Sequence, residues 1–98
     1  SLSCAVLRYA AEPEGIRLDG PLEIITLSGT LAAPGQGGVH LHASVADARG
    51  QVRGGHLMRG CIVRTTVEVV LALLPEWSFA RTLDVATGFQ ELVAARRP

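Results

Sequence analysis

The stretch VHLHASVADARGQVRGGHLM, residues Val39–Met58, decides the fold because it predicts a β-hairpin by itself. Apolar and polar residues alternate through Val39–Ala46, which is typical of a strand with one buried and one exposed face. Asp47 and Gly50 suit the first and fourth positions of a type I turn, and Gln51–Met58 then returns as the partner strand. The stretch therefore predicts two antiparallel strands joined by a tight turn.

The rest of the chain keeps the same two-residue period and is rich in β-branched residues. We therefore predict a mainly antiparallel β-sheet with few short helices. Further strands are expected at Ser1–Ala10, Leu22–Leu31, Cys61–Leu74, Trp77–Leu83 and Phe89–Val93. Asp19-Gly20-Pro21 is a strong turn signal before the second of these strands. The end of the Cys61–Leu74 segment could instead close as a helical turn before Pro75.

Length and composition limit the classes of protein that the chain can form. Its 98 residues allow one domain, residues 1–98. Nine arginines, no lysine and nine acidic residues give a net charge of zero, which argues against a strongly basic nucleic-acid binder. Apolar residues make up 48% and charged residues 18%, which excludes intrinsic disorder.

The longest aliphatic run, Val69–Leu74, is too short to span a bilayer. With no export signal at Ser1, we expect a cytoplasmic protein with no membrane partner.

The apolar content is high for so small a domain. A domain of this size buries only about two-thirds of its unfolded surface, so one core leaves apolar side chains uncovered. Further copies of the chain are the simplest cover, and we expect an oligomer. Cys4 and Cys61 lie far apart and follow no disulfide or zinc spacing, so we expect free thiols.

All three histidines lie in the predicted hairpin. His40 and His42 leave the same face of one strand about 6.5 Å apart, which allows two imidazoles to converge on one ion. A three-residue loop would pair Asp47 with Gln51. In that register His56 lies opposite His42 on the same face, whereas a two-residue loop turns His56 to the other face.

The hydrophobic pattern fits the three-histidine register poorly. That register puts Val52 and Met58 beside the histidines and Arg53 on the apolar face, so the two-residue loop suits these side chains better. Gly54-Gly55 could absorb the conflict as a β-bulge. Both registers stay open, and a site of three neutral histidines is a hypothesis. Such a site keeps an open coordination position, as catalytic and ligand-binding zinc sites do.

Other polar residues offer weaker candidates. Glu68 shares a strand face with Arg64 and could be a fourth metal ligand or a general base, or it could form a cross-strand or interface ion pair. No nucleophile motif is visible, so no catalytic residue is assigned. A local basic group could attract an acidic partner or a nucleic-acid backbone, or could be solvated charge. It consists of Arg49, Arg53, Arg59 and Arg64.

Five stretches resemble a known family in the right order along the chain. They are Leu22–Leu31, His40–Asp47, Gly50–Leu57, Gly60–Leu71 and Thr87–Leu92. Together they resemble the bacterial branch of the PPC domain (plants and prokaryotes conserved), also called domain of unknown function 296. The resemblance implies an α+β fold around an antiparallel sheet, and a homotrimer.

The resemblance also carries functional expectations. In plants the domain follows AT-hook segments of nuclear DNA-binding proteins and mediates self-association and partner binding. Bacterial members stand alone and are described as DNA-binding, with no established enzymatic activity. Some members hold a metal ion at the histidines of this pattern, which implies His40, His42 and His56 as ligands for zinc or another divalent metal.

Two departures from the family pattern affect these expectations. The family's domain usually has a further strand and helix before the part matching Ser1, and we expect this chain to lack them. The AT-hook core Arg-Gly-Arg-Pro is absent, and Ala95-Arg96-Arg97-Pro98 lacks its glycine. We expect a homotrimeric interaction module, self-associating and associated with DNA or other proteins. The alternative is a metal-binding protein or metal-dependent enzyme that uses the three histidines.

Overall fold

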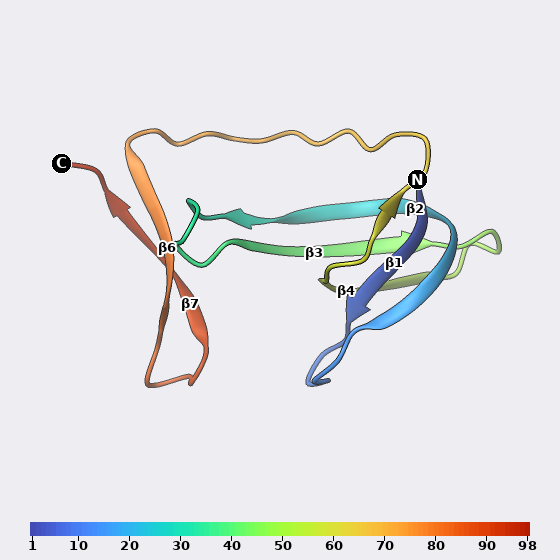
Figure 1. The fold of residues 1–98 in the computed structure, drawn as a ribbon, viewed down its shortest axis with the longest axis horizontal. Helices are drawn as coiled ribbons and strands as arrows, with labels where there is room; N and C mark the ends of the chain where they lie inside the picture. Colours follow the sequence, from blue (N-terminus) through green and yellow to red (C-terminus); the bar gives the residue numbers. More distant parts are fainter. The chain divides into compact units, whose positions relative to one another are not determined.

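The computed structural model describes residues 1–98 and contains β-strands but no helix. The strands are β1 (Leu2–Arg8), β2 (Ile16–Leu31), β3 (Val39–Ala46), β4 (Val52–Leu57), β5 (Ile62–Val63), β6 (Trp77–Leu83) and β7 (Gln90–Arg96) (Figure 1). The predicted antiparallel, sheet-rich fold is confirmed, but the predicted few short helices are wrong. Leu71–Leu74 forms no helical turn, because the proline that follows drives the residue before it toward an extended backbone.

The chain divides into two compact units, which are described separately. The first comprises Ser1–Gly29 and His40–Val69 and holds most of a five-stranded sheet. The second comprises Thr30–Val39 and Val70–Pro98 and holds the two-stranded sheet of β6 and β7. No helix with the length and hydropathy needed to cross a membrane is present.

The five-stranded sheet of the first unit closes on itself. Its strand order is β2-β3-β4-β1-β5, and β1 also pairs with β2. The first part of β2 pairs antiparallel with β1, from Leu7↔Ile16 to Leu2↔Leu22, and β2 then continues as the neighbour of β3. The long strand β2 therefore closes a ring of four strands, β2-β3-β4-β1, and β5 pairs with β1 beside this ring.

The turn predicted at Asp19-Gly20-Pro21 is wrong, because β2 continues without interruption through these residues. A Cβ on Gly20 would lie 2.5 Å from the carbonyl oxygens of both Leu2 and Ser3. Only a residue without a side chain lets β1 lie so close to β2 at this point. The glycine marks a close approach of two strands and not a reversal of the chain.

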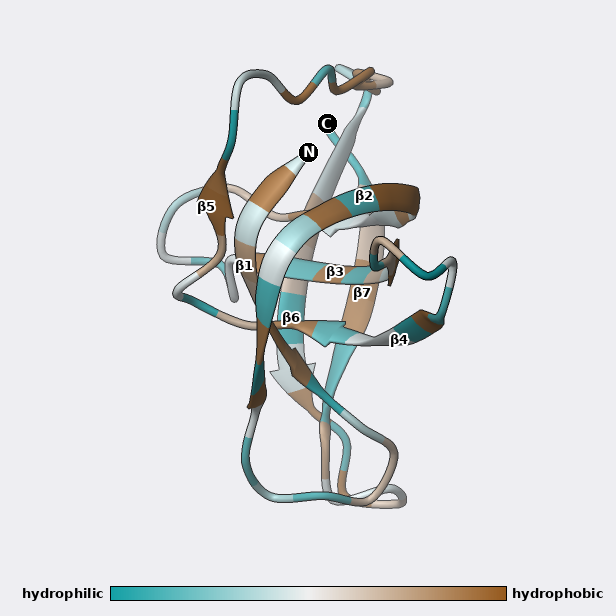
Figure 2. Cartoon of the chain, turned by 90° about the vertical axis from the view of Figure 1, so that its right-hand side faces the viewer, coloured by the Kyte–Doolittle hydropathy of each residue, from teal (hydrophilic) through white to brown (hydrophobic).

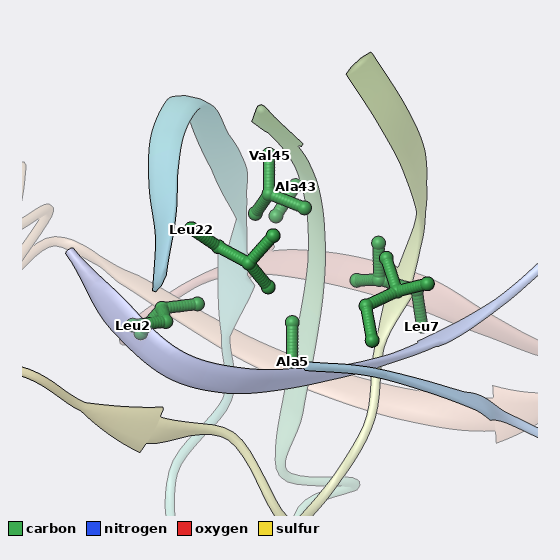
Figure 3. Close-up of a cluster of buried hydrophobic side chains, with 7 residues drawn as sticks. Leu2, Ala5, Leu7, Leu22, Ala43 and Val45 are labelled. Carbon is green, nitrogen blue, oxygen red and sulfur yellow. The ribbon is translucent and has the colours of Figure 1, made fainter. Parts of the chain in front are cut away.

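A small apolar core holds the first unit together. Its buried members come from β1, β2 and β3: Leu2, Ala5, Leu7, Leu18, Leu22, Ala43 and Val45. Figure 3 shows side chains from the three strands pointing into one common space. Leu7 and Val45 are the largest fully buried side chains, and each such side chain contributes about 1.5–3 kcal/mol by leaving water.

The long strand predicted at Cys61–Leu74 is wrong beyond Val63. Only Ile62 and Val63 form β5, which pairs with β1 through Cys4↔Ile62 and Leu2↔Val63. Thr65 then adopts a left-handed backbone with φ of 71°, which ends the pairing. Figure 2 shows β5 in the hydrophobic colour although its side chains are more than half exposed.

The second unit contains a regular antiparallel hairpin. Its pairs run from Trp77↔Arg96 to Leu83↔Gln90, which confirms both strands predicted for this region and extends the last one to Arg96. The Arg96 guanidinium lies 5.3 Å from the centre of the Trp77 ring, a cation–π contact. Every residue of β7 is exposed in the protomer.

Candidate metal centre

The turn between β3 and β4 fixes the register of the hairpin. The Asp47 N–H donates to the Gln51 carbonyl at 3.0 Å, and the Gly50 N–H donates to the Asp47 carbonyl at 2.9 Å. Gly50 has a φ of 78°, the left-handed conformation that the last residue of a three-residue loop requires. The Asp47 carboxylate also accepts the N–H groups of Arg49 and Gln51 at 2.9 Å each. The turn is therefore the three-residue form, held by the side chain at its first position.

The register that follows places His56 opposite His42. Five consecutive pairs connect β3 and β4 without a break, from His42↔His56 to Ala46↔Val52. His56 lies on the same face of the sheet as His42, and Arg53 pairs with the buried Val45 on the other face. The bulge proposed at Gly54-Gly55 is wrong. The hydrophobic pattern favoured the other register, yet Val52 is 57% exposed beside the histidine face.

The two glycines of β4 permit close approach of the strands on either side. A Cβ on Gly55 would lie 2.7 Å from the Arg8 carbonyl oxygen, and one on Gly54 would lie 3.2 Å from the Ala43 carbonyl oxygen. On the Gly55 side, β1 and β4 pair antiparallel through Leu7↔Leu57 and Arg8↔His56. The glycines therefore help to hold His56 between its two neighbouring strands.

The three histidine rings converge on one point of the outer face. The ring centres lie 5.0 Å apart for His40 and His42, 4.9 Å for His40 and His56, and 5.3 Å for His42 and His56. One nitrogen from each ring lies within 4.8 Å of the other two. His40 and His56 are half-buried, whereas His42 is exposed. The structure thus brings together all three histidines predicted from the sequence as metal ligands.

The donor set fits a transition-metal ion. Nitrogens that bind one tetrahedral zinc at about 2.0–2.1 Å lie about 3.4 Å apart, so small rotations of the rings close the observed triangle onto an ion. Imidazole nitrogens suit zinc, copper, nickel and iron rather than calcium or magnesium. With three protein ligands, a tetrahedral site keeps one position open.

The surroundings of the cluster are polar and contain one cation. Arg8 is the cross-strand partner of His56, and its Nη1 donates to the Glu12 carbonyl at 3.3 Å. Ser44, two residues beyond His42 on β3, shares a 2.6 Å hydrogen bond with the Thr26 hydroxyl of β2. No local signal in the sequence marks Arg8, because only the pairing of β1 with β4 brings it beside the hairpin.

The other residues considered from the sequence do not join the cluster. Glu68 is exposed, is not a member of the metal-ligand group, and forms no ion pair across strands of the protomer. Cys4 and Cys61 are free thiols, as predicted. The arginines of the local basic group are all exposed: Arg49, Arg53, Arg59 and Arg64.

A closed antiparallel sheet with three histidines on one hairpin defines a small β-domain with a candidate metal centre. Residues 1–75 match the model of the Plants and Prokaryotes Conserved (PCC) domain, and the chain belongs to this family. The resemblance found in the sequence is confirmed.

One solved structure is very similar to the whole chain. It is a hypothetical protein from Salmonella cholerae-suis (Salmonella enterica), with a TM-score of 0.92 and 41% sequence identity. The match covers 99% of this chain and 68% of that protein. The fold described above is therefore shared with a protein of determined structure.

Two curated relatives are much longer than this chain. Both are named bifunctional protein GlmU, from Synechococcus sp. strains JA-2-3B'a(2-13) and JA-3-3Ab, and are 53% and 51% identical over 92 residues. The matches cover 94% of this chain but only 14% of each relative. The chain is thus similar to a small part of those proteins.

Proposed function

We propose that this PCC-family chain binds a zinc-type divalent metal ion through His40, His42 and His56. The observation that carries the proposal is the convergence of three imidazole nitrogens to within 4.8 Å of one another. The hairpin register held by Asp47 and Gly50 supports the same conclusion, because it sets His56 against His42.

The chain's own residues define what such a site can do. Three neutral ligands and no carboxylate would leave the full charge of a divalent ion uncompensated. A bound ion of this kind supplies an open, Lewis-acidic coordination position. The site therefore suits ligand binding, with metal-dependent catalysis as the stronger version of the same proposal.

Metal analysis of untagged protein tests the proposal. We expect stoichiometric zinc, nickel or iron, and a higher melting temperature on addition of zinc. His42→Ala should weaken Co²⁺ binding by roughly a hundredfold or more, since the loss of outer-shell partners alone costs 10–100-fold. His42 is exposed, so its replacement leaves the core unchanged.

Ser44→Ala is the matched control, because Ser44 follows His42 on the same face of β3 without being a nitrogen donor. We expect this variant to bind Co²⁺ like the parent chain. Absence of stoichiometric metal together with no thermal shift on adding zinc would refute the proposal.

A second proposal, self-association, depends on exposed apolar side chains in the second unit. Val70 is 97% exposed, Leu73 82% and Phe89 71%. A two-stranded hairpin is marginally stable in water without further cover, and β7 is exposed along its whole length. We propose that copies of the chain cover these side chains, with the homotrimer of the family as the expected state.

Light scattering at micromolar concentration tests self-association, and the mass of a single folded chain would contradict it. The DNA-related role implied by the family stays a prediction of that resemblance. Nine arginines balance nine acidic residues, so the chain has no net positive charge to attract the phosphate backbone of DNA.

A further inference from the structure

Arg8 occupies a distinctive place next to the histidine cluster. It pairs with His56 across β1 and β4, and directly opposed residues in an antiparallel pair have Cβ atoms about 4.5–5.5 Å apart on the same face. A guanidinium offers five N–H donors, and here the only acceptor within hydrogen-bond distance is the Glu12 carbonyl at 3.3 Å. Arg8 forms no ion pair: the single ion pair of the protomer is between Arg17 and Asp19.

We propose that the histidine site binds a small oxyanion, held jointly by the open coordination position and by the Arg8 guanidinium. This inference rests on the proposed metal site. The ligand is identified by its chemistry: a negative charge shared by terminal oxygens, as in a carboxylate or a phosphate group.

Charge balance is the first argument for an anion. Three neutral imidazoles leave a divalent ion with a charge of +2, and no Asp or Glu belongs to the cluster. Arg8 adds a further positive charge at the neighbouring strand position. A cation beside a dication is unfavourable by Coulomb's law unless a negative charge lies between them. An anionic ligand supplies that charge.

Geometry is the second argument. The planar guanidinium matches the two oxygens of a carboxylate or phosphate in a bidentate manner. On the other side of the cluster, the hydroxyls of Thr26 and Ser44 form a hydrogen-bonded pair on the strand that carries His42 and its neighbour β2. The guanidinium on the β1 side of the cluster provides N–H donors for an oxyanion bound at the open coordination position.

The experiment uses untagged, Co²⁺-loaded protein in a non-coordinating buffer at constant ionic strength. Sodium acetate and inorganic phosphate are titrated separately while the visible absorption of Co²⁺ is recorded, with sodium chloride as the screening control. The variants are Arg8→Gln, Arg8→Lys and Arg53→Gln. Arg53 is the matched control, because it lies on β4 but pairs with Val45 on the opposite face of the sheet.

We expect acetate or phosphate to shift the Co²⁺ spectrum of the parent chain, and the anion that binds at the lower concentration identifies the group. Arg8→Gln should raise the half-saturating anion concentration at least about tenfold, because hydrogen bonds to charged groups are the strong ones. Arg8→Lys should recover only part of the affinity, and Arg53→Gln should have no effect. Without anion, Arg8→Gln should bind Co²⁺ at least as tightly as the parent, since a repelling charge is gone.

The outcomes separate this inference from the proposed function. If the parent chain fails to bind Co²⁺, the metal proposal and this inference both fall. If Co²⁺ binds but neither anion shifts the spectrum, or Arg8→Gln binds the anion like the parent, the oxyanion inference alone is overturned. Loss of Co²⁺ binding in Arg8→Gln would also overturn it, because Arg8 would then support the fold of the site rather than a ligand.

Discussion

Replacement of Gly55 by alanine should disturb the metal centre without removing any ligand. The added Cβ would lie 2.7 Å from the Arg8 carbonyl oxygen and 3.2 Å from the Arg8 carbonyl carbon. Both atoms belong to the backbone of β1, so the contact cannot be relieved by rotating a side chain. β1 must move away from β4 at the pair Arg8↔His56.

The expected loss of stability follows from two opposing effects. Overpacking of this kind costs about 1–3 kcal/mol, and the change from glycine to alanine returns about 0.4–1 kcal/mol by restricting the unfolded chain. The net loss in the free energy of unfolding is about 1–2 kcal/mol. For a domain of this size each kcal/mol lowers the melting temperature by about 4–8 °C, so we expect a decrease of about 5–15 °C.

Gly54→Ala is the matched control on the same strand. Its Cβ would lie 3.2 Å from the Ala43 carbonyl oxygen and 3.5 Å from the Ser44 Cβ, so the neighbours need to yield by only a few tenths of an ångström. The gain in the unfolded chain offsets this contact, and the variant should stay within about 0.5 kcal/mol of the parent.

Thermal unfolding and Co²⁺ titration of the two variants check the reasoning together. Gly55→Ala should lose stability and bind Co²⁺ more weakly, whereas Gly54→Ala should do neither. Equal stability of the two variants would refute the close approach of β1 and β4 as the reason for glycine at this position.

Three further predictions concern the core, the turn and the exposed apolar segment. Leu7→Ala should lower the free energy of unfolding in urea by about 2–5 kcal/mol, because Leu7 is fully buried; a loss below 1 kcal/mol would contradict its place in the core. Asp47→Ala removes the acceptor of two N–H groups and should cost about 1–2 kcal/mol in urea unfolding and weaken Co²⁺ binding; unchanged Co²⁺ affinity would show that the turn does not hold the register. Val70→Ser should shift light scattering toward smaller species while urea unfolding of the diluted chain stays unchanged, since Val70 is 97% exposed; an unaltered mass would exclude Val70 from the interface.

The hairpin could be predicted from the sequence because its signals are local. Alternation through β3 and the turn residues Asp47 and Gly50 act within a few positions of the chain. The register of β3 against β4 was harder to predict, since the turn residues favoured a three-residue loop and the hydrophobic pattern favoured a two-residue loop. The structure has the three-residue loop. Its hydrogen bonds join backbone groups of the turn, whereas leaving the Val52 side chain exposed costs little free energy.

Three failures of prediction involve partners that are distant in sequence. In the sequence Gly20 has the signal of a turn residue, but in the structure it permits the close approach of β1 to β2. The branched residues after Val63 have strand propensity but no neighbouring strand, and β-propensity expresses packing on a neighbour more than a backbone preference. Arg8 carries no motif, and only the pairing of β1 with β4 places it beside His56.

The alternation along β3 has a practical consequence for protein engineering. Ala43 and Val45 face the interior, while the neighbouring even-numbered residues face outward with the histidines. Structural support and chemical reactivity thus share one strand but occupy opposite sides of it. New ligand sets could be installed on the outward side, such as a carboxylate at Ser44, while the inward side continues to specify the scaffold.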